Sequence, residues 1–362
     1  MAAKKRVLSL GHVPEHNAET VKQFYDTFDV ISTTKEERER STFLEGLRTR
    51  KWGEFDAILR CFWYEGDEME PFDSELVPLL PDSLKIHSSC GAGYDWMDIP
   101  AYTKRGLSEP RIQFAAVLAV NTSSGFLYCN GASAPAEAVA DLALYLVISV
   151  FRYLTEAQLA ARSGSTETWQ KARAVSAKAQ NPEGQTLGII GLGRIGYLLA
   201  KKAYHGLDMN IQYHDIRRRT QEDEASVQAT YVDTLEGLVQ TSDCVVCCVP
   251  FEGQKIFDAT MFSRFKKGSR FVNIARGSLH DEAALVAALK SGQLSAAGLD
   301  VQEKEPEVHP ELIKMGNVTL TPHIGGTTVE SGVAFEKLAM DNITSFFQTG
   351  KALTPVDGTI GT

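Results

Sequence analysis

The chain has 362 residues, 43% of them hydrophobic and 23% charged, which is the balance of a folded protein long enough for two domains. Its formal net charge is -9 and its basic residues are scattered, so nucleic acid is not expected as a partner. The longest apolar stretch, residues 138–151, contains Asp141 and is shorter than the roughly 20 residues that cross a bilayer. These features argue against membrane and nucleic-acid functions and indicate a cytoplasmic protein.

The six cysteines show no pattern typical of a disulfide framework. Cys244, Cys247 and Cys248 lie in one apolar run, and no second Cys or His cluster at ligand spacing accompanies them. We interpret this run as a buried strand and expect no metal site. The only basic run, residues 217–219, is followed by acidic residues and is interpreted as a solvated turn.

Strand-length apolar runs alternate with helix-length segments from the start of the chain, which predicts an α/β fold with parallel sheets. In the first part, we expect helices over residues 18–29 and 43–51, and strands over residues 6–10, 30–33, 57–60 and 85–88. One long helix is then expected from residue 134 to about residue 163.

A second series of elements begins at residue 186 and alternates like a doubly wound nucleotide-binding domain. Helices such as 195–204 and 282–291 separate strands expected over residues 187–191, 210–214, 244–249, 270–274, 298–301 and 318–321. A last helix, residues 328–348, is expected to return to the first domain. The sequence thus predicts two doubly wound, Rossmann-like parallel-sheet domains with an interdomain cleft.

A glycine motif marks the start of the second series. Gly191, Gly193 and Gly196 have the Gly-x-Gly-x-x-Gly spacing, directly after an apolar strand and at the start of a helix. In a dinucleotide site, the first glycine permits the tight turn and the second lets the backbone approach the pyrophosphate. The third lets helix and strand pack closely. We therefore predict that a dinucleotide binds here.

The residue that ends the next strand bears on which dinucleotide binds. The Asp215 carboxylate can accept hydrogen bonds from the ribose hydroxyls of NAD and would repel a 2′-phosphate. Arg217 and Arg218 could instead hold that phosphate, which is the NADP alternative. Because the acid ends the strand and the arginines follow it, NAD is the predicted cofactor.

Three further segments place polar residues where the carboxyl edge of a sheet should face a cleft. One strand ends near Arg276, the strand over residues 298–301 is followed by acidic residues, and His323 lies on a loop. Together with the glycine motif and with Gly-Ala-Gly-Tyr-Asp at residues 91–95, these segments stand in the order found in the D-isomer-specific 2-hydroxyacid dehydrogenases. The chain resembles this family over nearly its whole length, and particularly its fungal D-mandelate dehydrogenase-type and 2-keto acid reductase members.

The resemblance implies a discontinuous, flavodoxin-like substrate-binding domain (residues 1–133 and 327–362) and an NAD-binding Rossmann domain (residues 134–326). It also implies hydride transfer between NAD(H) and a 2-keto acid/D-2-hydroxy acid pair. The keto acid is expected to be aromatic, of the glyoxylate or hydroxypyruvate type, or sugar-derived. A homodimer is expected because the family usually forms one. The alternative is a non-catalytic NAD-sensing scaffold, like the corepressors of this superfamily, which can keep the catalytic residues.

The chemistry of this reaction explains the catalytic residue types. A guanidinium can bind the carboxylate of a 2-keto acid bidentately and polarise the adjacent ketone, which suits Arg276. Hydride attack builds negative charge on the carbonyl oxygen, and His323 is the natural general acid. The resemblance gives Glu305 the hydrogen bond that supports the protonated imidazole, and Glu303 is the rival for this role.

The resemblance implies further contacts in both domains. Asp300 would lie at the nicotinamide carboxamide, and the substrate would be bound by Gly91, Ala92, Gly93 and Tyr94, partly through backbone amides. The remaining expected cofactor contacts, beside Arg276 and His323, are Arg194, Ile195, Val249, Pro250, Ala275, Gly325 and Gly326.

Some residues fall outside these motifs. His205, His280 and His309 lack motif partners and are expected at the surface or at helix ends. Four aromatic residues are expected in the core: Tyr94, Trp96, Trp63 and Tyr64. Because the resemblance puts the stretch around Tyr94 and Trp96 near the substrate, the alternative is that some of them line the pocket for the substrate's side chain.

Residues 107–126 are additional to the family pattern and show no clear amphipathic period. They are either a lineage-specific loop or translated intron sequence. The sequence of the transcript decides, because a message that encodes them excludes the intron. The insertion also leaves the alignment of residues 130–135 with the family open.

Overall fold

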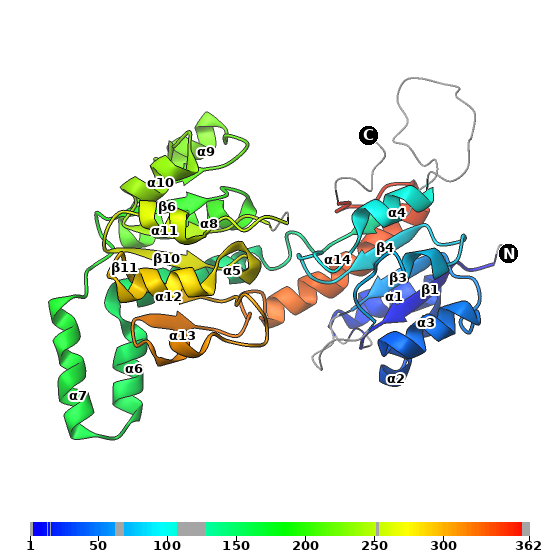
Figure 1. Ribbon diagram of the computed structural model, residues 1–362. Coiled ribbons are helices and arrows are strands. Elements are labelled where there is room, and N and C mark those ends of the chain that lie inside the picture. Colours follow the sequence, from blue (N-terminus) through cyan, green and yellow to red (C-terminus); the bar gives the residue numbers. More distant parts are fainter. Residues whose placement is uncertain are drawn as a thin grey trace. The chain divides into compact units, whose positions relative to one another are not determined.

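The computed structural model describes residues 3–12, 14, 16–61, 69–106, 127–250 and 253–356. The chain divides into two compact units, each built on its own parallel sheet (Figure 1). The first unit contains residues up to Pro135 and from Thr328 onward, and the second is Ala136–Thr327. The predicted α/β class with two parallel sheets is confirmed.

The first unit has five parallel strands in the order β2-β1-β3-β4-β5. They are β1 (Arg6–Leu10), β2 (Asp29–Ser32), β3 (Ala57–Arg60), β4 (Ile86–Ser89) and β5 (Leu127–Cys129). Its helices are α1 (Ala18–Thr27), α2 (Lys35–Arg38), α3 (Arg40–Arg48), α4 (Ile99–Gly106) and α14 (Val329–Thr349), with a 3-10 turn at Val77–Leu79.

Both faces of this sheet are buried. Because side chains alternate along a strand, Val7 joins one apolar cluster with α14 and α1, whereas Leu8 joins another with α3 and the 3-10 turn. The C-terminal helix α14 thus packs on the strands of the N-terminal segment, mainly β3 and β4. Figure 1 shows this helix, in orange to red, lying along the blue and cyan strands.

The second unit has seven parallel strands in the order β12-β11-β10-β9-β6-β7-β8. They are β6 (Thr186–Ile190), β7 (Asn210–His214), β8 (Thr230–Tyr231), β9 (Cys244–Cys247), β10 (Ser269–Asn273), β11 (Leu294–Leu299) and β12 (Val318–Leu320). Its helices are α5 (Ala136–Arg152), α6 (Leu154–Arg162), α7 (Thr166–Ala172), α8 (Arg194–Leu207), α9 (Gln221–Ser226), α10 (Leu235–Thr241), α11 (Ala259–Arg264), α12 (Glu282–Lys290) and α13 (Pro310–Lys314), with 3-10 turns at Arg173–Ala177 and Gly277–Leu279.

The sheet order places β6 between β7 and β9, so the winding direction reverses at β6. Ligands of open parallel sheets bind at the carboxyl ends of the strands beside such a switch point. The buried strand expected for the cysteine run is confirmed for Cys244 and Cys247, since every residue of β9 is buried, whereas Cys248 follows β9 and is half-buried. Among the described residues, no group of three or more His, Cys, Asp or Glu could hold a metal ion.

The prediction of one long helix from residue 134 to about residue 163 is wrong. Two helices, α5 and α6, occupy this stretch and meet at an angle of 79°. Tyr153 between them adopts a left-handed backbone, with φ of 53°, which ends the hydrogen-bond ladder of α5 while burying the aromatic ring. The apolar pattern continues across this residue and so hides the break. Within the described ranges, no single helix is long and apolar enough to span a membrane, and only the bent pair α5–α6 passes on length and composition.

Of the positions expected for His280, the helix end is confirmed, because it ends the 3-10 turn Gly277–Leu279, and the surface is wrong, because its side chain is fully buried beside Asn273. His309 does lie at a helix end, where its ring accepts the backbone N–H of Glu311. His205 lies in the last turn of α8 and is exposed. The insertion at 107–126 and the aromatic pair at positions 63 and 64 lie outside the described residues.

Candidate active site

The glycine motif forms the turn between β6 and α8. Gly191 has a φ of +88°, and a Cβ on Gly196 would lie 2.1 Å from the carbonyl oxygen of Gly191. A side chain at either position would therefore distort the turn. Gly193 differs, because a Cβ there would meet nothing within 4 Å. The missing side chain at Gly193 leaves space at the start of the helix that an approaching ligand can use.

Gly193 is the N-cap of α8 and makes no side-chain capping bond. The first backbone N–H groups of the 14-residue helix, at Arg194, Ile195 and Gly196, have no partner within the helix. Such a helix start attracts phosphate through its amides and its dipole. Val249 and Pro250 follow β9, and a Cβ at Gly191 would lie 2.7 Å from Val249 Cγ1. The turn therefore fits the pyrophosphate of a dinucleotide.

Asp215 follows β7, the strand beside β6. Its carboxylate accepts the backbone N–H groups of Leu192, at 2.8 Å, and Arg217, at 3.0 Å. The bond to Leu192 fixes the acid beside the glycine turn, where the ribose of a dinucleotide bound there would lie.

Of the three arginines at residues 217–219, Arg218 and Arg219 are paired with acids on α9. Arg218 binds Glu224 through Nε and Nη2, at 2.8 and 3.0 Å, and Arg219 lies 3.3 Å from Asp223. The hydrogen bonds from Arg218 and from Tyr213 lower the pKa of Glu224 to about 2. The guanidinium of Arg218 is therefore already engaged with a carboxylate.

Arg276 lies on the turn that follows β10. The Asn273 amide shapes this turn by donating to the carbonyl of Arg276, at 2.8 Å, and by accepting the N–H of Ala275, at 3.0 Å. A Cβ on Gly277 would lie 1.7 Å from the carbonyl oxygen of Gln302, so only glycine allows the two backbones to meet. This contact places the Arg276 turn against the segment that follows β11.

His323 and Glu305 are in direct contact. The imidazole Nδ1 donates to the Glu305 carboxylate at 2.8 Å, and about two fifths of the His323 side chain is exposed. Partial burial acts to raise the pKa of Glu305, but the hydrogen bond and charge of His323, together with the charge of Arg276, lower it overall. The three residues predicted as the catalytic set are thus near one another at the carboxyl edge of one sheet.

The rival acid has other partners. The Glu303 carboxylate contacts Lys255 at 2.6 Å and accepts the backbone N–H of Glu282 at 3.0 Å. The Glu282 carboxylate in turn accepts the N–H of Glu303 at 3.1 Å. Glu303 therefore joins α12 to the segment after β11, and Glu305 is the acid beside the imidazole.

Asp300, Gly325 and Gly326 lie on the same side of the sheet as His323. Asp300 directly follows β11 and is only 1% exposed, and its carboxylate is hydrogen-bonded to the His323 loop. Gly325 is buried and Gly326 half-buried in that loop.

The first unit carries the predicted substrate residues on the loop after β4. Gly91 has a φ of +104°, and its carbonyl accepts the N–H of Gly131 at 2.7 Å. The carbonyl of Ala92 accepts Nδ2 of Asn130, also at 2.7 Å. Tyr94 is half-buried, with its ring 6.3 Å from that of Tyr128. Asn130 and Gly131, which follow β5, therefore fix the shape of this glycine-rich loop, which also contains Gly93.

Sequence reasoning missed the residues that hold these segments in place. Asn130 and Asn273 are buried amides whose partners are backbone groups of other segments. It also missed Arg60, at the carboxyl end of β3, whose guanidinium pairs with Glu70 and lies 3.8 Å from the ring centre of Trp96. A polar residue at the end of a predicted apolar strand was the available signal for Arg60 and Asn273, whereas Asn130 follows β5, which was not predicted.

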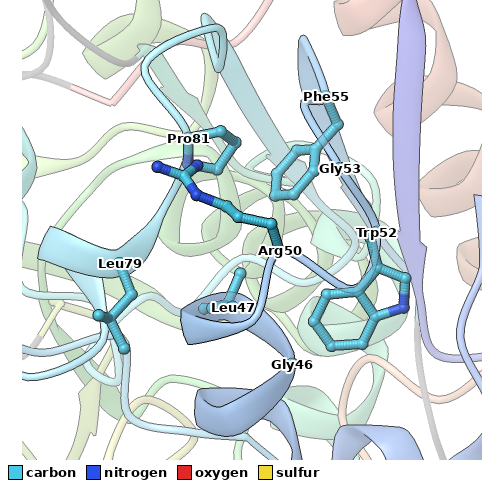
Figure 2. A pocket seen from close by; sticks show the side chains of 8 residues that line it. All are labelled: Gly46, Leu47, Arg50, Trp52, Gly53, Phe55, Leu79 and Pro81. Atoms are coloured by element: carbon cyan, nitrogen blue, oxygen red, sulfur yellow. The ribbon is translucent and has the colours of Figure 1, made fainter.

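A surface hollow in the first unit lies apart from these residues (Figure 2). The ring of Trp52 packs against Gly46 beneath it, and the hollow has no room for a water-sized molecule. Its lining contains no predicted site residue: Gly46, Leu47, Arg50, Trp52, Gly53, Phe55, Leu79 and Pro81.

Comparison with known proteins identifies the family. Residues 144–325 match the NAD binding domain of the D-isomer specific 2-hydroxyacid dehydrogenases. The D-mandelate dehydrogenase of Rhodotorula graminis is 39% identical, with a TM-score of 0.89 and 98% of both chains covered. The 4-methyl-2-oxopentanoate reductase A of Aspergillus oryzae is 35% identical over 86% of this chain and 87% of its own length. The glyoxylate reductase of Thermococcus litoralis is 33% identical over 95% of this chain and 94% of its own length. The chain therefore belongs to the D-isomer specific 2-hydroxyacid dehydrogenase family.

Proposed function

We propose that this enzyme reduces 2-keto acids to D-2-hydroxy acids with NADH, and that Arg276, Glu305 and His323 carry out the reaction. The observation that carries the proposal is the contact between His323 and Glu305 at 2.8 Å, with Arg276 close enough for its charge to act on the same carboxylate. A guanidinium and a carboxylate-supported imidazole are the groups that a 2-keto acid needs.

Each residue has a distinct task in this mechanism. When bound, the nicotinamide cofactor supplies the hydride for the carbonyl carbon. The Arg276 guanidinium binds the substrate carboxylate and polarises the ketone. His323 donates the proton to the carbonyl oxygen from Nε2, because its Nδ1 is committed to Glu305. The Glu305 carboxylate accepts the hydrogen bond from Nδ1 and so fixes the orientation of the imidazole.

NAD is the proposed cofactor. The Asp215 carboxylate beside the glycine turn would accept the ribose hydroxyls of NAD and repel a 2′-phosphate. The pairing of Arg218 with Glu224 supports this choice, because it leaves that guanidinium engaged with a carboxylate instead of a phosphate.

The two units would divide the work. We assign cofactor binding to the domain over residues 134–326 and substrate binding to residues 1–133 with 327–362. We assign the substrate carboxylate to the backbone amides of Gly91, Ala92 and Gly93, and the substrate's side chain to Tyr94. The names of the relatives include mandelate, 4-methyl-2-oxopentanoate and glyoxylate, which supports substrates from glyoxylate to aromatic keto acids. Sugar-derived keto acids remain a further candidate class that these names do not support.

We also propose that the enzyme is a cytoplasmic homodimer of fungal origin. The dimer is supported by the α6–α7 pair, which projects from its sheet with Leu159 and Trp169 largely exposed (Figure 1). Fungal origin is supported by the relatives from Rhodotorula and Aspergillus.

The test is the oxidation of NADH and of NADPH by purified enzyme with glyoxylate, hydroxypyruvate, benzoylformate, 4-methyl-2-oxopentanoate and 2-ketogulonate. We expect turnover with at least one of them and a preference for NADH. His323→Ala should remove most turnover while NADH still binds. Failure of every keto acid to react would overturn the proposal and favour the NAD-sensing scaffold.

A further inference from the structure

A largely buried carboxylate on α9 holds the guanidinium of Arg218. Only 10% of the Glu224 side chain is exposed, and its carboxylate accepts Nε of Arg218 at 2.8 Å and Nη2 at 3.0 Å. Tyr213 on β7 is fully buried, and its hydroxyl donates to the same carboxylate. The two parallel bonds fix the direction of the guanidinium, and Tyr213 fixes the carboxylate that makes them.

The same network shapes the backbone that follows Asp215. The hydroxyl of Tyr213 also accepts the backbone N–H of Arg219 at 3.0 Å, so this hydroxyl joins α9 to the three arginines. At the start of this stretch, the Asp215 carboxylate accepts the N–H of Arg217 at 3.0 Å. Tyr213 and Glu224 therefore hold the far end of the stretch against α9, while Asp215 holds its near end.

Arg218 lies close to the expected position of the dinucleotide's ribose. Its guanidinium carbon is 5.3 Å from the ring centre of Tyr231, and the hydroxyl of Tyr231 donates to the backbone carbonyl of Asp215 at 3.2 Å. About 60% of the Arg218 side chain is exposed, so packing restrains it little. A guanidinium released from Glu224 would be free to turn toward a 2′-phosphate, which it would bind through the same pair of nitrogen donors.

We propose that Glu224 is a specificity-determining residue for the cofactor: it binds Arg218 on the α9 side and so withholds this guanidinium from the 2′-phosphate of NADPH. The inference rests on the proposed function and adds a second acid to the choice of cofactor. Asp215 would repel the 2′-phosphate, whereas Glu224 occupies the cation that would attract it. Selection against NADPH therefore has two components that mutation can separate.

The first experiment measures the dissociation constants of NADH and NADPH, by the fluorescence of the reduced cofactor, in wild type and in Glu224→Gln. The amide oxygen of this variant still accepts the hydroxyl of Tyr213, but its NH₂ group meets the Arg218 guanidinium donor to donor. One charge-assisted hydrogen bond to the phosphate changes affinity by about tenfold or more. We therefore expect NADPH to bind about tenfold more tightly, with NADH within about twofold of wild type.

Glu222→Gln is the matched control. Glu222 lies on the same helix and is exposed, and the substitution removes the same charge. If α9 acted only by general repulsion of the phosphate, both variants would bind NADPH more tightly to the same extent. We expect Glu222→Gln to leave both dissociation constants within about twofold of the wild-type values.

Two further variants test the route of the effect. Glu224→Gln combined with Arg218→Met should lose the gain in NADPH affinity, because methionine carries no charge for the phosphate. Tyr213→Phe removes the hydroxyl that holds both Glu224 and the backbone of Arg219, so it should give a smaller gain in the same direction. Tyr213→Phe also keeps the proposal testable if Glu224→Gln fails to fold.

Three results would overturn the inference: unchanged NADPH affinity in Glu224→Gln and Tyr213→Phe, an equal gain in Glu222→Gln, or a gain that persists without Arg218. These binding measurements need no keto acid, so they still test Glu224 if no 2-keto acid reacts. A wild-type protein that binds NADPH more tightly than NADH would contradict the proposed cofactor, whereas the change between variants tests the role of Glu224.

Discussion

Glu303 and Glu305 are two positions apart in the sequence but have different partners. The Glu305 carboxylate accepts a hydrogen bond from the imidazole of His323, whereas the Glu303 carboxylate contacts Lys255 and the start of α12. An acid that supports a general acid acts in the transition state, and an acid that joins two segments acts on stability. The two glutamates therefore form a matched pair for mutation.

We expect Glu305→Gln to lower kcat/KM for keto acid reduction by about 100-fold, because a neutral amide stabilises the imidazolium less than a carboxylate does. Glu303→Gln should change kcat/KM less than about threefold while lowering the melting temperature, because it weakens the contacts with Lys255 and α12. Steady-state kinetics and thermal unfolding of both variants check this. Equal kinetic losses in the two would contradict the assignment.

His280 is another residue whose surroundings determine its chemistry, here its pKa. It is fully buried, and its Nδ1 accepts Nδ2 of Asn273 at 3.0 Å, which fixes the amide that shapes the Arg276 turn. Burial lowers the pKa of His280 from 6.5 to about 4. The folded protein therefore keeps this imidazole neutral at pH values where the unfolded chain protonates it.

This difference makes folding sensitive to acid. Below pH 6.5 the unfolded state binds the extra proton, so the free energy of unfolding falls as the pH drops toward 4. The lowered pKa of His280 predicts that the free energy of unfolding falls by about 2 kcal/mol between pH 7 and pH 5. His280→Asn keeps an acceptor for Asn273 but cannot titrate. Its free energy of unfolding should therefore fall by about 2 kcal/mol less than that of the wild type over this pH range. Urea unfolding at both pH values measures it, and parallel losses in the two proteins would be the contrary result.

Among the elements, the longer buried strands were easier to predict from the sequence than very short strands or bends between helices. The apolar runs around Val7, Ile189 and Val246 predict β1, β6 and β9, because both faces of a parallel sheet are buried. The short strands β5 and β8 were missed, since three and two residues show no periodicity. The bend at Tyr153 was missed because apolar residues continue on both sides of it.

The candidate site was predictable to the extent that its residues belong to motifs. Arg276, Asp300, Glu305 and His323 follow predicted strands, so they were expected at one edge of the sheet. The roles of Asn130 and Asn273 were not, because hydrogen bonds between distant segments leave no periodic trace in the sequence. The choice of Glu305 over Glu303 came from the family resemblance, because residue spacing alone does not separate the two acids.

In the proposed homodimer, the α6–α7 pair would contact the second copy of the chain. It projects from the sheet, and Leu159 and Trp169 on it are 58% and 56% exposed (Figure 1). Large exposed apolar side chains on a projecting element are typical of an interface. Ile313 on α13 is similarly exposed, at 61%, and lies outside this pair, so it provides a matched control.

We expect Trp169→Glu to shift the protein from dimer to monomer in sedimentation velocity at micromolar concentration, because a buried unpaired carboxylate destabilises an interface. Ile313→Glu should leave the dimer intact. A monomeric wild-type protein, or a dimer that persists in Trp169→Glu, would contradict the role of this helix pair.

At the scale of the whole molecule, the two units have separate apolar cores. The clusters that contain Leu8 and Val7 belong to the first unit, and those that contain Leu187 and Val245 belong to the second. Two cores can unfold in two steps, and a ligand stabilises the unit that binds it. Tryptophans help to separate the steps, because Trp52 and Trp96 of the first unit are buried or half-buried and Trp169 of the second is exposed.

NAD⁺ at 100 times its dissociation constant should therefore stabilise the second unit by about 3 kcal/mol. In thermal unfolding, the transition seen by circular dichroism but not by tryptophan emission should move to higher temperature. The fluorescence transition of the first unit should stay within about 1 °C, since a shift of a few degrees needs about 1 kcal/mol. Asp215→Ala, which removes the proposed ribose contact, should shrink the shift at the same NAD⁺ concentration. Equal shifts of both transitions would mean that cofactor binding is not confined to the unit with the glycine turn, or that the two cores unfold as one.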